Sequence, residues 1–96
     1  MNNQDLVPII TMEECAEVTQ AIAKVFRFGL NQKHPETNLT NRDALAIEIG
    51  QLLYMLKELM IDWKLDVQTV NTAYEEKSHA LFKWSKYFKE NIHEKI

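Results

Sequence analysis

The stretch LAIEIGQLLYMLKELMID, residues 45–62, carries most of the information on the fold. At about 100° per residue, its Leu, Ile and Met side chains surround nearly the whole circumference of a helix. Such a helix is typical of the centre of a bundle or of a dimer interface. Glu48 projects onto the middle of this apolar arc, and Gln51 lies on the same side. A lone carboxylate is costly to bury unless it is paired, protonated or bound to a metal.

Turn and capping residues divide the chain into three predicted helices. They span residues 6–28, 41–62 and 67–88. Gly29 is placed to end the first helix. Thr40, with Asp43 three residues later, is the expected N-cap of the second helix, and Asp66 that of the third. We therefore predict an all-α fold, a bundle of three long helices that is completed by dimerisation.

The segments outside these helices are a loop and a tail. Residues 29–40 lack helical periodicity and form a predicted loop, long enough to suggest a functional role. The charged tail, residues 89–96, is expected to fray. A chain of 96 residues is the size of one domain, so we predict a single domain over 1–96 with a core over about 6–88.

The composition excludes several classes of protein. The hydrophobic fraction of 46% and the charged fraction of 26% are those of a globular domain. A net charge of −3 argues against nucleic-acid binding, which favours a basic face. No apolar run is long enough to span a membrane, and residues 1–7 do not resemble a secretory signal. We therefore expect a soluble, cytoplasmic protein.

Each predicted helix directs at least one charged side chain inward. On the first helix, Glu14 projects onto the edge of the apolar face, with Glu17 and Lys24 along its rim. The predicted apolar face consists of Cys15, Val18, Ile22, Val25 and Phe26. On the third helix, Lys77 interrupts the centre of an apolar stripe. Together with Glu48 on the second helix, these residues predict one polar site inside the bundle.

Carboxylates and cations in this arrangement favour a particular chemistry. Carboxylates three residues apart share a helix face and can hold one cation. Oxygen ligands favour Mg²⁺ or Mn²⁺. None of the three histidines falls in the constellation, which disfavours zinc and the Glu-x-x-His di-iron site. Mg²⁺ held by few carboxylates usually binds phosphate and water as well, and Lys24, Arg27 and Lys77 would suit phosphate oxygens.

Each of these residues also has a purely structural interpretation. The glutamates of the first helix could form a solvated acidic face. Glu48 could form a buried ion pair, Lys77 could extend to water, and Gln51 could be a satisfied interface amide. The prediction of a site therefore depends on the conjunction of the residues.

Two segments carry a family resemblance. EECAEVTQAIAKVFRFG, residues 13–29, and NRDALAIEIGQLLYML, residues 41–56, resemble the all-α nucleotide pyrophosphohydrolases of the MazG-like superfamily, in particular its short single-domain type found in phages and bacteria. The hallmark of that family is E-x-x-E on one helix and E-x-x-D on the next. Glu14 and Glu17 match the first motif, and Glu48 matches the start of the second. The resemblance covers about residues 6–88.

The resemblance implies an activity, a cofactor and a set of site residues. Such proteins cleave nucleoside triphosphates between the α and β phosphates to give a monophosphate and pyrophosphate, with Mg²⁺ bound by the acidic motifs. Mn²⁺ is an alternative metal, and relatives assemble as dimers or as dimers of dimers. The loop over 29–40 could lie over the nucleotide. The implied metal ligands are Glu14, Glu17, Glu48 and Gln51, of which the three glutamates are also catalytic, and the implied substrate-binding residues are Lys24, Arg27 and Lys77.

Gln51 departs from the family pattern, which has Asp at this position. A glutamine oxygen can bind Mg²⁺, but it is neutral, so the loss of one negative charge should weaken the binding of a second metal most. Three outcomes stay open from the sequence. Gln51 binds metal through water and activity survives, a carboxylate from elsewhere substitutes, or the chain is a weakened nucleotide-binding or protein-assembly module.

Overall fold

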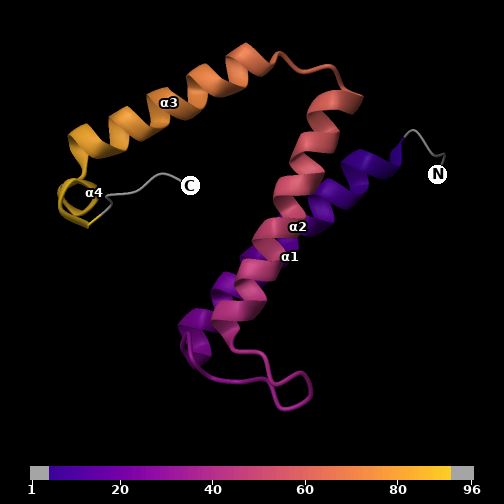
Figure 1. Ribbon diagram of the computed structural model, residues 1–96, viewed down its shortest axis with the longest axis vertical. Coiled ribbons are helices and arrows are strands. Elements are labelled where there is room, and N and C mark those ends of the chain that lie inside the picture. The colour runs from indigo at the N-terminus through magenta and orange to yellow at the C-terminus, as the bar shows by residue number, and fades with distance from the viewer. Residues whose placement is uncertain (1–4, 92–96) are drawn as a thin grey trace. The chain divides into compact units, whose positions relative to one another are not determined.

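The computed structural model describes residues 5–91, and it is built from helices (Figure 1). These are α1 (Leu6–Phe28), α2 (Asn41–Asp62), α3 (Val67–Trp84) and α4 (Lys86–Asn91). No strand occurs in the part of the chain that the structure describes, beyond one isolated bridge between Lys33 and Thr40. The predicted all-α class is therefore confirmed. The chain divides into two compact units, Met1–Lys64 and Leu65–Ile96.

Local capping residues end α1 and begin α2, as predicted. Gly29 ends α1 with a φ of 86°, and its N–H donates to the Val25 carbonyl at 2.8 Å. Glycine adopts this conformation without a steric penalty. Thr40 begins α2 with a complete capping box, because its Oγ1 accepts the Asp43 N–H at 3.0 Å while Asp43 Oδ2 accepts the Thr40 N–H.

In the first unit, α1 and α2 form an antiparallel pair along a narrow seam (Figure 1). From Thr11 onward, the least exposed side chains of α1 recur every three or four residues, as in two helices packed along their length. They are Thr11, Glu14, Val18, Ala21 and Val25. Thr11 is 4% exposed, and its hydroxyl donates to its own helix at the Val7 carbonyl. Glu14 therefore lies on the stripe of α1 that packs against α2.

The seam is narrower than the apolar face that the sequence predicts for α1. Cys15 and Phe26 belong to that predicted face, yet both are exposed, and Phe26 is 86% exposed. A helix pair buries only one stripe, whereas the predicted face assumed helices on both sides. On α2, Leu53 and Ile61 are likewise exposed, at 60% and 62%.

In the second unit, the prediction of one helix over 67–88 is wrong. Asp66 caps α3 as expected, since its Oδ2 accepts the Thr69 N–H at 3.3 Å. The helix ends at Trp84, because Ser85 adopts an extended conformation with φ −103° and ψ 117°. Ser85 Oγ then accepts the Phe88 N–H at 3.3 Å and begins α4. Helix α4 extends to residue 91 and residues 92–96 lie outside the described part, so the predicted fraying of residues 89–96 stays a prediction.

The structure determines each unit by itself and not the position of one relative to the other (Figure 1). The three-helix bundle, the single domain and the dimer therefore remain predictions. Within residues 5–91, no helix is both long and apolar enough to cross a membrane.

Candidate metal centre and adjoining cavities

Three carboxylates meet on the seam between α1 and α2. Glu14 and Glu17 project from α1, and Glu48 projects from α2. Each offers one oxygen, and these three oxygens all lie within 4.8 Å of one another. We call Glu14, Glu17 and Glu48 the carboxylate cluster. The structure therefore brings together the three glutamates that the sequence predicts as metal ligands.

Two oxygens of the cluster are buried without a partner. Glu14 Oε2 and Glu48 Oε2 are shielded from solvent, and neither has a hydrogen bond in the protein. Their side chains are half-buried, whereas that of Glu17 is exposed. A buried carboxylate oxygen without a partner loses its hydration and gains nothing in return. This cost falls if a cation binds to the oxygens.

The proximity of the carboxylates raises the pKa of Glu48 above its usual range. The largest cause is a hydrogen bond shared with Glu17, followed by burial and by repulsion from the charges of Glu17 and Glu14. Such a bond needs a proton on one of the two carboxyls, so it is absent when both are ionised. The positive charge of Lys24 lowers the pKa of Glu48 and so offsets part of this increase. Without a cation, Glu48 is thus more readily protonated than an isolated glutamate.

The donor set fits a hard divalent cation. The cluster contains only carboxylate oxygens, which Mg²⁺ and Mn²⁺ prefer, and no thiol or imidazole. Three carboxylates leave positions open for water or phosphate. Glu14, Glu17 and Glu48 would hold such an ion.

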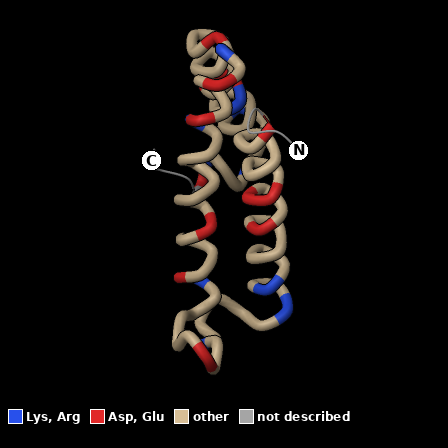
Figure 2. Tube along the Cα trace, turned by 90° about the vertical axis from the view of Figure 1, so that its right-hand side faces the viewer, with Lys and Arg blue, Asp and Glu red and all other residues tan. Residues whose placement is uncertain are grey.

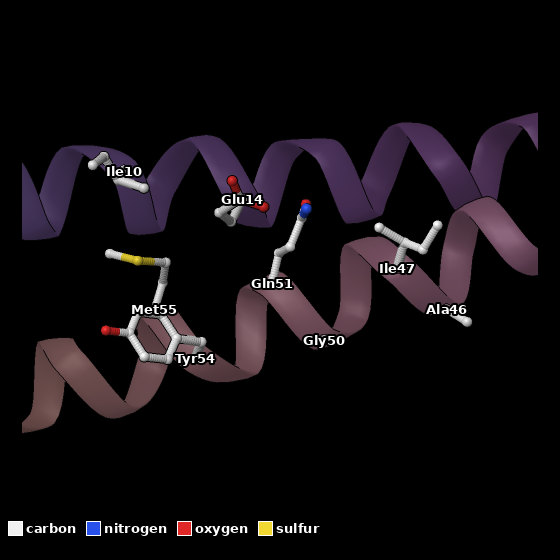
Figure 3. A pocket seen from close by; sticks show the side chains of 8 residues that line it. All are labelled: Ile10, Glu14, Ala46, Ile47, Gly50, Gln51, Tyr54 and Met55. Atoms are coloured by element: carbon white, nitrogen blue, oxygen red, sulfur yellow. The ribbon is translucent and has the colours of Figure 1, made fainter. Parts of the chain in front are cut away.

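Gln51 lies in a cavity next to the cluster. The cavity has a volume of about 550 Å³. Figure 3 shows Glu14 directed from α1 toward α2 and Gln51 directed from α2 toward α1, on the walls of this cavity. Its other lining residues are apolar, small or aromatic: Ile10, Ala46, Ile47, Gly50, Tyr54 and Met55. We call it the apolar cavity; Glu14 is its one charged lining residue.

The three predicted phosphate-binding cations occupy different places. Lys24 is on α1 and close enough to Glu48 to affect its pKa. Arg27 covers the ring of Phe28, with its guanidinium carbon 5.6 Å from the ring centroid. Lys77 is on α3 in the second unit, so its position relative to the cluster is not defined. Figure 2 shows acidic positions along the α1–α2 pair and basic positions at the loop end of α1.

A second cavity lies where α1 ends and α2 begins. It has a volume of about 500 Å³, and we call it the loop pocket. Two lysines and a histidine line it together with apolar and amide side chains. The lining residues are Lys24, Phe28, Gln32, Lys33, His34, Pro35, Thr37, Leu39, Asn41 and Ala44. The sequence did not identify Lys33 or His34 as site residues, since a loop without periodicity gives no indication of where its side chains point.

No protein-family model, curated protein or solved structure matches this chain.

Proposed function

We propose that this chain is a Mg²⁺-dependent nucleoside triphosphate pyrophosphohydrolase, for which Mn²⁺ is an alternative metal. The observation that carries the proposal is the pair of buried, unpartnered oxygens of Glu14 and Glu48 on one seam. Two helices that only needed to pack would place apolar side chains at these positions. The resemblance to MazG-like enzymes in the two glutamate motifs supports the same function.

The residues have separate roles in this proposal. Bound Mg²⁺ would neutralise phosphate charge and make water a better nucleophile. Glu14, Glu17 and Glu48 hold the cation, and Lys24 attracts phosphate oxygens beside them. The reaction consumes one water, whose oxygen ends on the α or the β phosphorus while the former bridging oxygen stays with the other. The products are a nucleoside monophosphate and pyrophosphate.

We also propose that the chain functions as a homodimer or a dimer of dimers. Large apolar side chains on α1 and α2 stay exposed, among them Phe26 at 86% and Leu53 at 60%. By contrast, the hydrophobic residue that the described part of the pair buries is the small Ala21. A second copy of the chain would remove such surfaces from water, which is favourable.

A weakened nucleotide-binding or protein-assembly module is the second candidate, and Gln51 favours it. Gln51 lies beside Glu14 in the apolar cavity and supplies no negative charge there. Since the charge of the ligands governs affinity for hard cations, a site with three carboxylates can bind nucleotide and turn it over slowly.

Thermal unfolding of the full chain distinguishes a metal-dependent nucleotide site from a packing feature. We expect a nucleoside triphosphate and Mg²⁺ together to raise the Tm more than either does alone, because both bind the folded state. The Glu48→Gln variant should lose this synergy, whereas Glu13→Gln, a neighbouring exposed glutamate outside the cluster, should keep it. Equal responses of the two variants would refute the proposed role of Glu48.

A further inference from the structure

The apolar cavity shares Glu14 with the carboxylate cluster, and the loop pocket contains Lys24, whose charge acts on Glu48 of the cluster. The lining of the apolar cavity runs along α1 from Glu14 to Ile10, away from the loop, and along α2 from Met55 to Ala46. The loop pocket begins at Lys24, the cation that acts on Glu48, and extends into the loop. A nucleoside triphosphate bound at the cluster therefore has two directions in which to place its base and its terminal phosphates.

The charges of the lining residues distinguish these two directions. The loop pocket is lined by Lys24, Lys33 and His34, and no carboxylate is among its lining residues. The apolar cavity has no cation, and its one charged group is the carboxylate of Glu14. Terminal phosphates carry negative charge, so they are stabilised by lysine and repelled by a carboxylate. A base, in contrast, suits the apolar walls and the ring of Tyr54.

The loop is organised by its own hydrogen bonds before any ligand binds. The His34 N–H donates to the Leu39 carbonyl at 2.8 Å, and the Asn41 side chain donates to the Gly29 carbonyl at 2.8 Å. The Arg42 N–H donates to the Leu30 carbonyl at 3.0 Å. A pocket already held in shape loses less conformational entropy when it binds a ligand.

The donors available in the loop pocket are side chains. The first N–H groups of α2 are already used, since those of Asn41 and Ala44 donate to the carbonyls of Gln32 and Thr40. The helix end is thus not an open anion site. His34 Nδ1 accepts the Glu36 N–H at 3.1 Å, so the proton of the neutral ring is on Nε2, which can donate. Lys24 and Lys33 add ammonium groups to this donor set.

We propose that the loop pocket is the subsite for the two terminal phosphates of the substrate, with the base directed toward the apolar cavity. This inference rests on the proposed function and assigns the orientation of its substrate. Lys33 and His34 bind the phosphates that leave as pyrophosphate. Lys24 lies between that subsite and the carboxylate cluster, so it is placed next to the bond that breaks.

The test uses inorganic pyrophosphate and the nucleoside adenosine as separate probes on the full, isotope-labelled chain. Amide chemical shifts are followed with and without Mg²⁺. Pyrophosphate should shift the amides of residues 29–41, and adenosine should shift those around Tyr54. The Lys33→Gln variant should bind pyrophosphate roughly tenfold or more weakly, since a charge-assisted hydrogen bond is lost. Lys57→Gln, which removes an exposed lysine of α2 outside both cavities, should bind as the unaltered chain does.

The outcomes separate this inference from the proposed function. Adenosine shifts in the loop and pyrophosphate shifts around Tyr54 would overturn the orientation, as would equal pyrophosphate affinities of the two lysine variants. Hydrolysis of triphosphates by a chain that binds pyrophosphate elsewhere would overturn the subsite alone. Pyrophosphate binding in the loop by a chain that hydrolyses no triphosphate would overturn the hydrolase and retain the anion subsite.

Discussion

The Glu48→Gln substitution should have opposite effects on stability in the presence and absence of a divalent cation. Without metal, Glu48 is held beside Glu14 and Glu17, and one of its oxygens is buried without a partner. Removing its charge relieves the repulsion and the burial cost, and glutamine has nearly the same shape. With metal, the same change removes one of three anionic ligands.

The expected size of each effect follows from the geometry. Two unit charges at the 4.8 Å limit of the cluster repel by about 0.9 kcal/mol in water and about 3.5 kcal/mol at an effective dielectric constant near 20. Glu17 is exposed and Lys24 offsets part of the repulsion, so the lower figure applies. We expect Glu48→Gln to raise the free energy of unfolding by about 1 kcal/mol in a chelator. Mg²⁺ at about 100 times its Kd should add about 2.7 kcal/mol to the unaltered chain.

Chemical denaturation at neutral pH, in a chelator and then in Mg²⁺, measures both effects. Glu48→Gln should be the more stable protein in the chelator and the less stable one in saturating Mg²⁺. Glu13→Gln, the exposed neighbour of the cluster, should follow the unaltered chain in both conditions. The reasoning is refuted if Glu48→Gln is destabilised in the chelator, or if it keeps the full stabilisation by Mg²⁺.

Three further outcomes are expected. Gln51→Asp adds a carboxylate beside Glu14, so it should tighten Mg²⁺ binding by roughly tenfold in calorimetry, and an unchanged Kd would place Gln51 away from the metal. Because the pKa of Glu48 is raised, the folded chain binds more protons than the unfolded chain at pH values just above the usual glutamate pKa. Without metal, the free energy of unfolding should therefore fall as the pH rises through this range. Mg²⁺ should bind more tightly as the pH rises over the same range. A titration in which Glu48→Gln shows the same slope would contradict this. Thr40→Ala removes the capping box of α2 and should cost about 1 kcal/mol in denaturation, while Thr19→Ala on the exposed face of α1 should cost less.

Helix boundaries could be predicted where a local side chain sets them. Gly29, Thr40 and Asp66 act through their own backbone conformation or through a hydrogen bond three residues away, so the sequence contains the whole cause. Ser85 was missed because serine is tolerated inside helices as well as at their ends, and its neighbours continue the helical pattern. How much of each apolar face is buried depends on partners that the sequence does not place, which is why Phe26 is exposed against expectation.

The carboxylate cluster could be predicted because periodicity fixes which face of a helix a residue shares. Glu48 falls among apolar residues on α2, and an acidic pair on the facing side of α1 is a consistent partner. The loop pocket could not be predicted in this way. Lys33 and His34 reach it through the fold of the loop, which depends on hydrogen bonds between backbone groups that any residue could supply.

The most direct test of the proposed function is pyrophosphate release from a panel of ribo- and deoxyribonucleoside triphosphates, with Mg²⁺ and then Mn²⁺. The chain should release pyrophosphate and the matching monophosphate from at least one member, only with metal, and Glu48→Gln should release neither. Orthophosphate as the product, turnover in a chelator, or the absence of turnover across the panel would contradict the assignment as a pyrophosphohydrolase.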